Sequence, residues 1–342
     1  SKLIKVEIMS DDEIAGTYNM AADGTLTLAS GGSKTITVTT GSGFAIDNTA
    51  DDMSKNATYA VVAPGTHTFR IRYWLRNTTD APRGTIEGTV SKIVTLNCTA
   101  GSIHDITANL NLHDYDGDHY YMWDAQEQYW KGHEWNHGGS QPTINYWLPG
   151  ATISNDYAKN NSDPRFYNAA FTSGVDNPAT HTSFKNLPNV NEMSWYCMYG
   201  DPRWDADELW TTMGHLYKGG MWFKKKSVLQ AEGHYNSNTA YDGSDWRTAK
   251  KFGNWIVPLT LPSVSDANNY FYLPALGYYD TRDSGNLYNV RFYGTFWSSS
   301  ASPQYSDRAY YLWFGAGNVY VREDYERHFG FRAQKFSDFG DN

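Results

Sequence analysis

The chain has 342 residues, a net charge of −9 at pH 7 and an aromatic content of 16%. This length is sufficient for two domains with separate cores. The acidic balance, with Lys224–Lys226 as the main basic cluster, argues against a nucleic-acid-binding protein. There is no run of about 18 apolar residues and no signal peptide at Ser1, which indicates either a cytosolic protein or a mature piece of an exported one.

Aromatic residues are concentrated in the C-terminal two thirds of the chain. Residues 1–112 contain Trp74 as their single tryptophan, and the rest of the 13 tryptophans lie in 113–342. Three of the 26 tyrosines fall in the first segment. We therefore predict two domains, 1–112 and 113–342.

The first domain is predicted to be all-β. Its β-branched, largely alternating segments are separated by Gly, Asp, Asn and Pro, and six or seven short strands at this spacing predict a β-sandwich. Because Ser1 falls directly before the first strand, we expect a longer precursor or a processing site at this point. The predicted strands are 3–8, 25–28, 34–38, 59–62, 67–73 and 106–112.

The junction between the two domains is acidic. Asp114, Asp116 and Asp118 have the spacing of the first three calcium ligands of an EF-hand, but Gly117 comes one place early. Ala125 stands where a closing carboxylate is needed. We predict a solvated acidic linker and no cofactor, with calcium as the weaker alternative.

Residues 120–192 are predicted to be largely irregular. Dense aromatic residues between Tyr120 and Trp147 are interspersed with Gly and Pro, which favours loops. Residues 120–123 are predicted to form the first strand of the second domain. The Asn-rich segment 150–192 is predicted to be long loops.

One helix is predicted after these loops, followed by a buried strand at 221–223. Asp205 is the expected N-cap with Glu208 at the third helical position. Gly219–Gly220 would end the helix. The residues expected on its apolar face are Leu209, Met213 and Leu216.

The run from Tyr270 to Phe336 predicts an antiparallel β meander. Apolar and aromatic residues alternate with small or charged ones in short blocks separated by turn residues. The blocks are 270–273, 293–298, 309–314, 318–322 and 329–336.

Four blocks in order within this run resemble the Fibrobacter-type major paralogous domain: 273–277, 297–300, 310–312 and 330–332. That family has a fold similar to C-type lectins and formylglycine-generating enzymes. The resemblance implies an α+β C-type-lectin-like domain over 113–342, extended by similar text at 191–196 and 200–204. In such folds the first and last strands pair, so 120–123 should lie antiparallel beside 328–332. Arg332 is followed by Ala333 where the family often has cysteine.

The first domain is similar to the second domain of fimbrillin-like proteins of Bacteroidales, the subunits of type V pili. The similarity is carried by residues 15–18, 63–65 and 98–106. It implies an exported lipoprotein precursor, proteolytic trimming, a place in the fimbrium at the outer-membrane surface, and assembly with other pilus subunits by strand addition.

Signals for catalysis are weak. Ser298–Ser300 lack a nucleophile elbow around them and are interpreted as structural residues. Cys98 and Cys197 lie in apolar surroundings without a CxxC motif and are predicted to be buried free thiols. Formylglycine-type chemistry depends on active-site cysteines, so the resemblance does not extend to that activity.

Flat aromatic side chains are the remaining candidates for ligand contact. Most are expected in the core, notably Trp222, Trp297 and Trp313. The loop residues Trp130, Trp135, Trp147 and Trp246 are the predicted ligand-binding residues.

The sequence therefore favours a β-sandwich followed by a C-type-lectin-like domain, acting as a pilus-tip or surface adhesin that binds a glycan or matrix protein of the host or community. A purely structural pilus subunit is the first alternative. A carbohydrate-active enzyme is the second.

Overall fold

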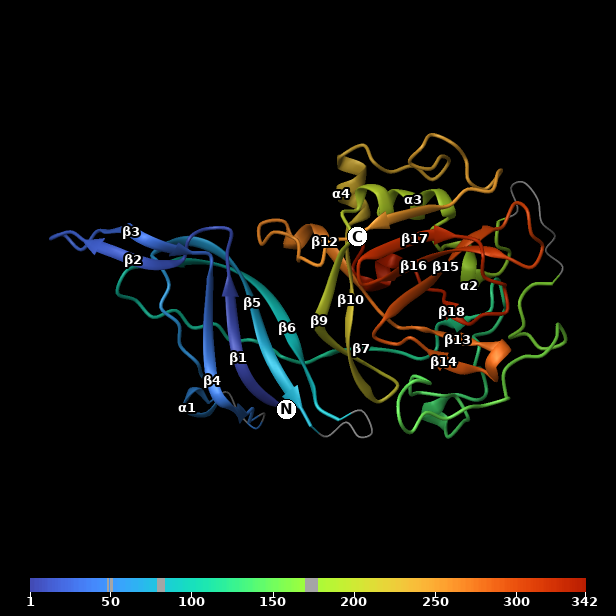
Figure 1. Ribbon diagram of the computed structural model, residues 1–342, viewed down its shortest axis with the longest axis horizontal. Coiled ribbons are helices and arrows are strands. Elements are labelled where there is room, and N and C mark those ends of the chain that lie inside the picture. Colours follow the sequence, from blue (N-terminus) through green and yellow to red (C-terminus); the bar gives the residue numbers. More distant parts are fainter. Residues whose placement is uncertain (48, 50–51, 79–83, 170–177) are drawn as a thin grey trace. The chain divides into compact units, whose positions relative to one another are not determined.

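The computed structural model describes residues 1–47, 49, 52–78, 84–169 and 178–342 (Figure 1). The protein is mostly β-sheet, with 39% of its residues in strands and 11% in helices. It divides into two compact units. The first is Ser1–Leu112 with Asp207–Leu209 and Pro262–Asn268, and the second is His113–Ala206, Trp210–Leu261 and Asn269–Asn342.

The first unit is built on four antiparallel strands and one hairpin. The strands lie in the order β4 (Thr35–Ala45), β1 (Lys2–Met9), β5 (Gly65–Asn77) and β6 (Ile86–Cys98) (Figure 1). The hairpin consists of β2 (Ala15–Met20) and β3 (Leu26–Ser33), and a short helix α1 (Met53–Asn56) follows Asp52, whose carboxylate caps it.

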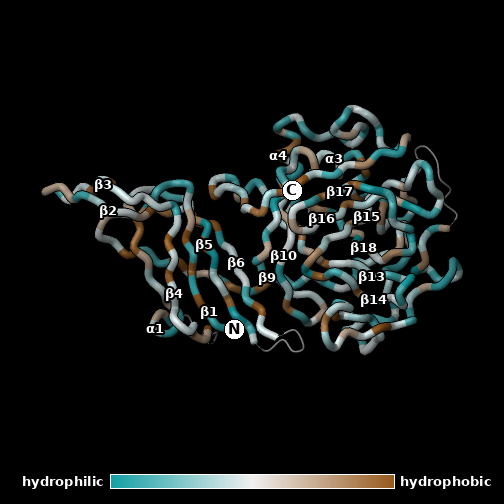
Figure 2. Tube along the Cα trace, viewed as in Figure 1, coloured by the Kyte–Doolittle hydropathy of each residue, from teal (hydrophilic) through white to brown (hydrophobic). Residues whose placement is uncertain are grey.

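The sheet of the first unit has one apolar face. Hydrophobic and hydrophilic residues alternate along its strands (Figure 2), and in β5 the buried side chains Phe69, Ile71 and Leu75 share a face. Val6 on β1 lies opposite Tyr73 and Ile8 lies opposite Ile71, which continues this face across the sheet.

Four predicted strands of the first unit are present within β1, β3, β4 and β5. The predicted strands 59–62 and 106–112 are wrong, since both segments lie outside any strand. β6 was not predicted, because its apolar pattern is interrupted by Gly88, Ser91 and Lys92. The β-rich prediction is confirmed. Within the described part of 1–112 the strands form the run β4-β1-β5-β6 and the separate hairpin of β2 and β3.

The second unit contains two larger sheets. One has the order β11 (Gly253–Ile256), β17 (Asn318–Arg322), β16 (Ala309–Gly315), β15 (Tyr293–Ala301), β18 (Phe331–Arg332) and β8 (Tyr120–Tyr121). The other has the order β12 (Tyr270–Pro274), β10 (His215–Lys224) and β9 (Arg203–Thr212), with β7 (His113–Tyr115) parallel to β9.

Smaller elements complete the second unit. A hairpin of β13 (Tyr278–Asp280) and β14 (Asn286–Tyr288) is separate from both sheets. The helices are α2 (Thr182–Lys185), α3 (Val190–Tyr199) and α4 (Lys226–Ala231), with 3-10 turns η1 (Trp135–His137), η3 (Thr281–Asp283) and η4 (Phe336–Phe339). A further 3-10 turn, η2 (Ala267–Asn269), belongs mostly to the first unit. In Figure 1 α3 lies over β17, with which it packs.

The predicted pairing of the first and last strands of this unit is confirmed. Tyr121 lies opposite Phe331 and Tyr120 opposite Arg332 in an antiparallel pair. The meander is confirmed only for β15, β16 and β17. β18 instead runs parallel to β15, and β12 pairs with β10 in the other sheet.

The predicted helix over 205–216 is wrong, because these residues form the hairpin of β9 and β10. Met213 and Gly214 connect the strands with φ angles of 49° and 78°, the two positive values that a tight hairpin turn requires. Trp210 and Tyr217 stack across the hairpin with ring centroids 5.3 Å apart. The apolar spacing at 209, 213 and 216 therefore suits a hairpin as well as a helix.

The longest helix of the described residues, α3, lies partly in the segment predicted to be loops. Asn189 caps it, and Glu192 bonds back to the Asn189 backbone in a complete capping box. Its buried side chains follow helical spacing and include Val190, Met193 and Cys197. The capping box and the helical spacing are both present in the sequence, but the polar, Asn-rich residues before Asn189 led to a prediction of loops.

Candidate functional site

Two of the four predicted ligand-binding tryptophans are buried, so their assignment is wrong. Trp130 is 0% exposed and Trp246 is 1% exposed. The Trp130 ring meets Tyr279 edge-on at 5.3 Å, and Trp246 donates its indole N–H to Asp242 at 3.1 Å. Glycine and proline near these residues indicate loops. The aromatic side chains of those loops nevertheless pack into the protein interior and are not exposed.

Trp135 is also held against the protein body. It opens η1 and is half-buried, and its ring lies close to the hairpin turn at Gly214. Its backbone N–H donates to the side-chain oxygen of Gln141. Of the four predicted residues, Trp147 is the one with a largely exposed side chain, at 64%.

Trp147 belongs to a cluster of three rings, Tyr146, Trp147 and Tyr288, which we term the aromatic platform. Ring centroids are 5.3 Å apart for Tyr146 and Trp147, 5.2 Å for Tyr146 and Tyr288, and 5.6 Å for Trp147 and Tyr288. Tyr146 is 41% exposed. Tyr288 is buried, and its ring contacts both exposed rings.

Two hydrogen bonds, one within the backbone and one from backbone to side chain, hold the platform in place. The N–H of Tyr146 donates to the carbonyl of Leu287 on β14 at 2.7 Å. The N–H of Asn289 donates to the side-chain oxygen of Asn145 at 2.8 Å. The chain segment carrying Tyr146 and Trp147 is therefore tied at two points to β14 and the residue after it, although the two lie far apart in sequence.

A carboxylate lies beside the platform. The Tyr288 hydroxyl donates to Asp283. Burial and this bond raise the pKa of Tyr288 well above its ordinary value of 10, so the phenol stays protonated and keeps donating. A flat apolar face next to a hydrogen-bond acceptor is a combination that suits the ring and hydroxyl groups of a sugar.

Tyr146, Tyr288 and Asp283 were not predicted as partners of Trp147. Tyr146 lies within the dense aromatic run, and Tyr288 within a short aromatic segment, so both were visible as aromatic residues. Their proximity depends on β14 lying beside the loop at 145–148, and nothing in local spacing predicts that pairing.

The acidic junction is committed to hydrogen bonds within the protein. Asp114 accepts from the Thr211 hydroxyl at 2.6 Å, and Asp116 accepts from His119 at 2.7 Å and from the Asp118 backbone at 2.9 Å. Burial alone would raise the pKa of Asp116, but the His119 bond and the charge of Arg332 outweigh it and hold that pKa well below the usual range. Within the described ranges, no group of three or more His, Cys, Asp or Glu is placed to hold a metal ion.

The serines near Trp297 have structural roles, as interpreted from the sequence. The Ser300 N–H donates to the Ser298 hydroxyl oxygen at 3.0 Å, and the Val190 N–H donates to the Ser300 hydroxyl oxygen at 3.0 Å. Cys98 and Cys197 are buried and unbridged, which confirms that prediction. Burial raises the pKa of the Cys197 thiol well above its ordinary value, so it is not an activated nucleophile.

The core assignments made from the sequence are met in part. Trp297 is 1% exposed, whereas Trp222 and Trp313 are half-buried.

No helix in the described part of the chain is long and apolar enough to span a lipid bilayer. No protein-family model matches the chain, and neither a curated protein nor a solved structure matches it.

Proposed function

We propose that the protein is a subunit of a surface fimbrium whose second unit binds a glycan or protein ligand through the aromatic platform. In this proposal the first unit is a fimbrillin-like sandwich and the second is a C-type-lectin-like domain. The protein is exported to the outer-membrane surface, and its partners are other pilus subunits and a ligand on host or community surfaces.

The observation that carries the binding proposal is the exposure of Trp147 within a fixed ring cluster. Exposing a tryptophan is unfavourable because its apolar surface stays in contact with water. Trp147 is nevertheless exposed and packs on the rings of Tyr146 and Tyr288 instead of in the core. Held in one orientation, it loses little conformational freedom when a ligand stacks on it. Asp283 adds an acceptor for a hydroxyl or amide group of that ligand.

The proposal of strand addition is supported by the partly covered face of the first unit. Apolar side chains on its sheet are only half-buried, and they include Ile8, Ile36, Val38, Val94 and Leu96. Tyr59 and Val61 are 66% and 90% exposed in a segment with strand-like composition.

The segment 103–112 adds a second argument. It makes no backbone hydrogen bond to another strand among the described residues, although Ala108, Leu110 and Leu112 alternate with exposed neighbours as they would in a strand. An extended segment from another subunit would pair with such unused edges and cover the apolar face.

A glycan and matrix-protein binding screen of the full chain tests the proposed function. The Trp147→Ala variant should lose at least about tenfold in affinity for any ligand found, which corresponds to ~1.4 kcal/mol. Phe252→Ala is the matched control, because Phe252 is 66% exposed and lies outside the platform. Equal loss in both variants, or unchanged binding by Trp147→Ala, would contradict the assignment of the platform.

Absence of any ligand in the screen would favour the purely structural subunit. In that case, subunit polymerisation should still be blocked by a charged substitution on the half-buried face, such as Val38→Lys. Turnover of a bound glycan would favour the carbohydrate-active enzyme instead.

A further inference from the structure

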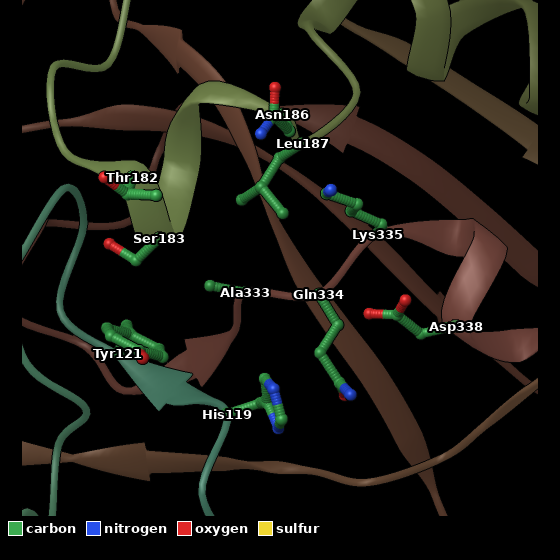
Figure 3. A pocket seen from close by; sticks show the side chains of 10 residues that line it. All are labelled: His119, Tyr121, Thr182, Ser183, Asn186, Leu187, Ala333, Gln334, Lys335 and Asp338. Carbon is green, nitrogen blue, oxygen red and sulfur yellow. The ribbon is translucent and has the colours of Figure 1, made fainter.

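A cleft in the second unit is lined in part by polar side chains whose orientation is fixed by hydrogen bonds to neighbouring residues. Figure 3 shows α2 residues on one wall and residues of β8 and the C-terminal segment on the other. Its volume is about 190 Å³, which is room for about six water molecules at ~30 Å³ each. The residues that carry the argument are His119, Gln334, Leu187 and Ala333.

The buried guanidinium of Arg332 organises one wall of this cleft. Its Nη1 donates to the backbone carbonyl of Asp116 at 2.7 Å, and its Nε donates to the side-chain oxygen Oε1 of Gln334 at 3.0 Å. The Arg332 side chain is 0% exposed, so both bonds are shielded from water. Because Arg332 donates to Oε1, the Gln334 NH₂ group faces away from Arg332, and Gln334 is part of the cleft lining.

Asp116 fixes His119 in the same way. The ring nitrogen Nδ1 of His119 donates to Asp116 Oδ1 at 2.7 Å. An ionised carboxylate can only accept, so Nδ1 carries the proton of this bond, and in the imidazole form of His119 the lone pair is on Nε2. The His119 side chain is 40% exposed, and it contributes to the lining of the cleft. This wall therefore offers one fixed acceptor, His119 Nε2, and one fixed donor, the Gln334 NH₂ group.

Apolar atoms lie between these polar groups. Leu187 and Ala333 are 6% and 4% exposed and form part of the lining. Thr182 and Ser183 stand on the opposite wall (Figure 3), and because the Ser183 hydroxyl donates to the Ala125 carbonyl at 2.8 Å, Ser183 offers a ligand an acceptor. The two charged residues of the lining, Lys335 and Asp338, have opposite signs, so the cleft favours a neutral ligand.

We propose that this cleft binds one neutral sugar residue that carries an acetamido group. The acetamido carbonyl accepts from Gln334, its N–H donates to His119 Nε2, and its methyl group packs on Leu187 and Ala333. The sugar hydroxyls meet Thr182 and Ser183. Arg332 and Asp116 are positioning residues, since they act by orienting Gln334 and His119. The inference rests on the proposed glycan-binding function but uses a site separate from the aromatic platform.

The test is a titration of the full 342-residue chain with N-acetylglucosamine, glucose and N-acetylalanine methylamide, followed by NMR of the protein and of the ligand. We expect N-acetylglucosamine to bind at least about tenfold more tightly than glucose. Gln334→Glu should lose at least about tenfold, because a carboxylate still accepts from Arg332 but no longer donates into the cleft. His119→Leu, which removes the acceptor at a half-exposed position, should lose a similar factor.

The control variant is Phe252→Ala, which lies outside both the cleft and the aromatic platform and should leave this binding unchanged. Circular dichroism and a thermal melt check that each variant is folded, and His119→Leu serves if Gln334→Glu does not fold. Equal binding of glucose and N-acetylglucosamine would overturn the proposal, as would unchanged binding by the two cleft variants. Tighter binding of N-acetylalanine methylamide would assign the cleft to a peptide instead. No binding of any probe at millimolar concentration would also overturn it.

Discussion

Replacing Phe331 with alanine tests whether the last strand closes the second unit. The Phe331 side chain is 0% exposed and has five aromatic rings within 6 Å, measured between ring centroids. The closest is Trp297, at 4.4 Å. Truncation of a buried phenylalanine costs about 3–5 kcal/mol, from lost transfer energy and the cavity left behind. With so many rings fixed around it, the site can collapse little, so we expect a loss of about 4 kcal/mol.

Urea unfolding followed by tryptophan fluorescence measures this loss selectively. All tryptophans except Trp74 lie in the second unit, so the signal reports on that unit. The midpoint should fall by more than about 1 M at a typical slope, and the slope should stay constant. Phe252→Ala, at a site 66% exposed, should change the free energy of unfolding by less than about 0.5 kcal/mol. A loss below about 1 kcal/mol for Phe331→Ala would refute the closure argument.

Three further outcomes are expected. The Arg247 guanidinium holds the pKa of Asp245 at about 2, below its ordinary 3.8, so this carboxylate stabilises the fold above pH 3.8 and the contribution disappears as pH falls through 2. Acid unfolding curves of Asp245→Asn should lack that component, and an unchanged curve would contradict it. Adding calcium or a chelator should leave the melting temperature unchanged, because the acidic junction is predicted to bind no metal. A calcium-dependent rise in melting temperature that Asp116→Ala abolishes would show instead that the junction binds calcium. Thermolysin should cleave first within 103–112, because this segment is largely exposed and pairs with no strand among the described residues. Mass spectrometry of the first fragments identifies the cleavage site, and an intact 103–112 segment in those fragments would contradict the prediction.

Strand patterns were the most predictable part of the fold. β16 is a continuous apolar run and β17 alternates buried valines with half-buried residues, and both patterns are typical of strands in a buried sheet. The segment 205–216 shows the limit of this reasoning, because spacing of four and three fits both a helix and a hairpin with a two-residue turn. Local text could not reveal that Met213 adopts a positive φ, a conformation rarely chosen by such a residue.

The candidate site was predictable only in kind. Trp130 and Trp147 stand in similar loop text, yet one is buried and the other is exposed. The difference lies in which distant ring each one meets, Tyr279 for Trp130 and Tyr288 for Trp147. The network of Asp116, Arg332 and Gln334 joins residues more than 200 positions apart, so it emerges only once the first and last strands are paired.

That pairing also has a mechanical consequence. In an antiparallel pair the start of β8 and the end of β18 lie at the same end, so tension between them would open their hydrogen bonds one after another. Tension between His113 and a ligand held at Trp147 follows a different path. It runs along the chain through β8 to the segment that contains the buried Trp130, so β8 lies on the load path and β18 braces it through their shared hydrogen bonds. Pairing with β18 would therefore reinforce β8 against tension applied between His113 and Trp147, whereas tension applied directly between the start of β8 and the end of β18 would separate the same two strands.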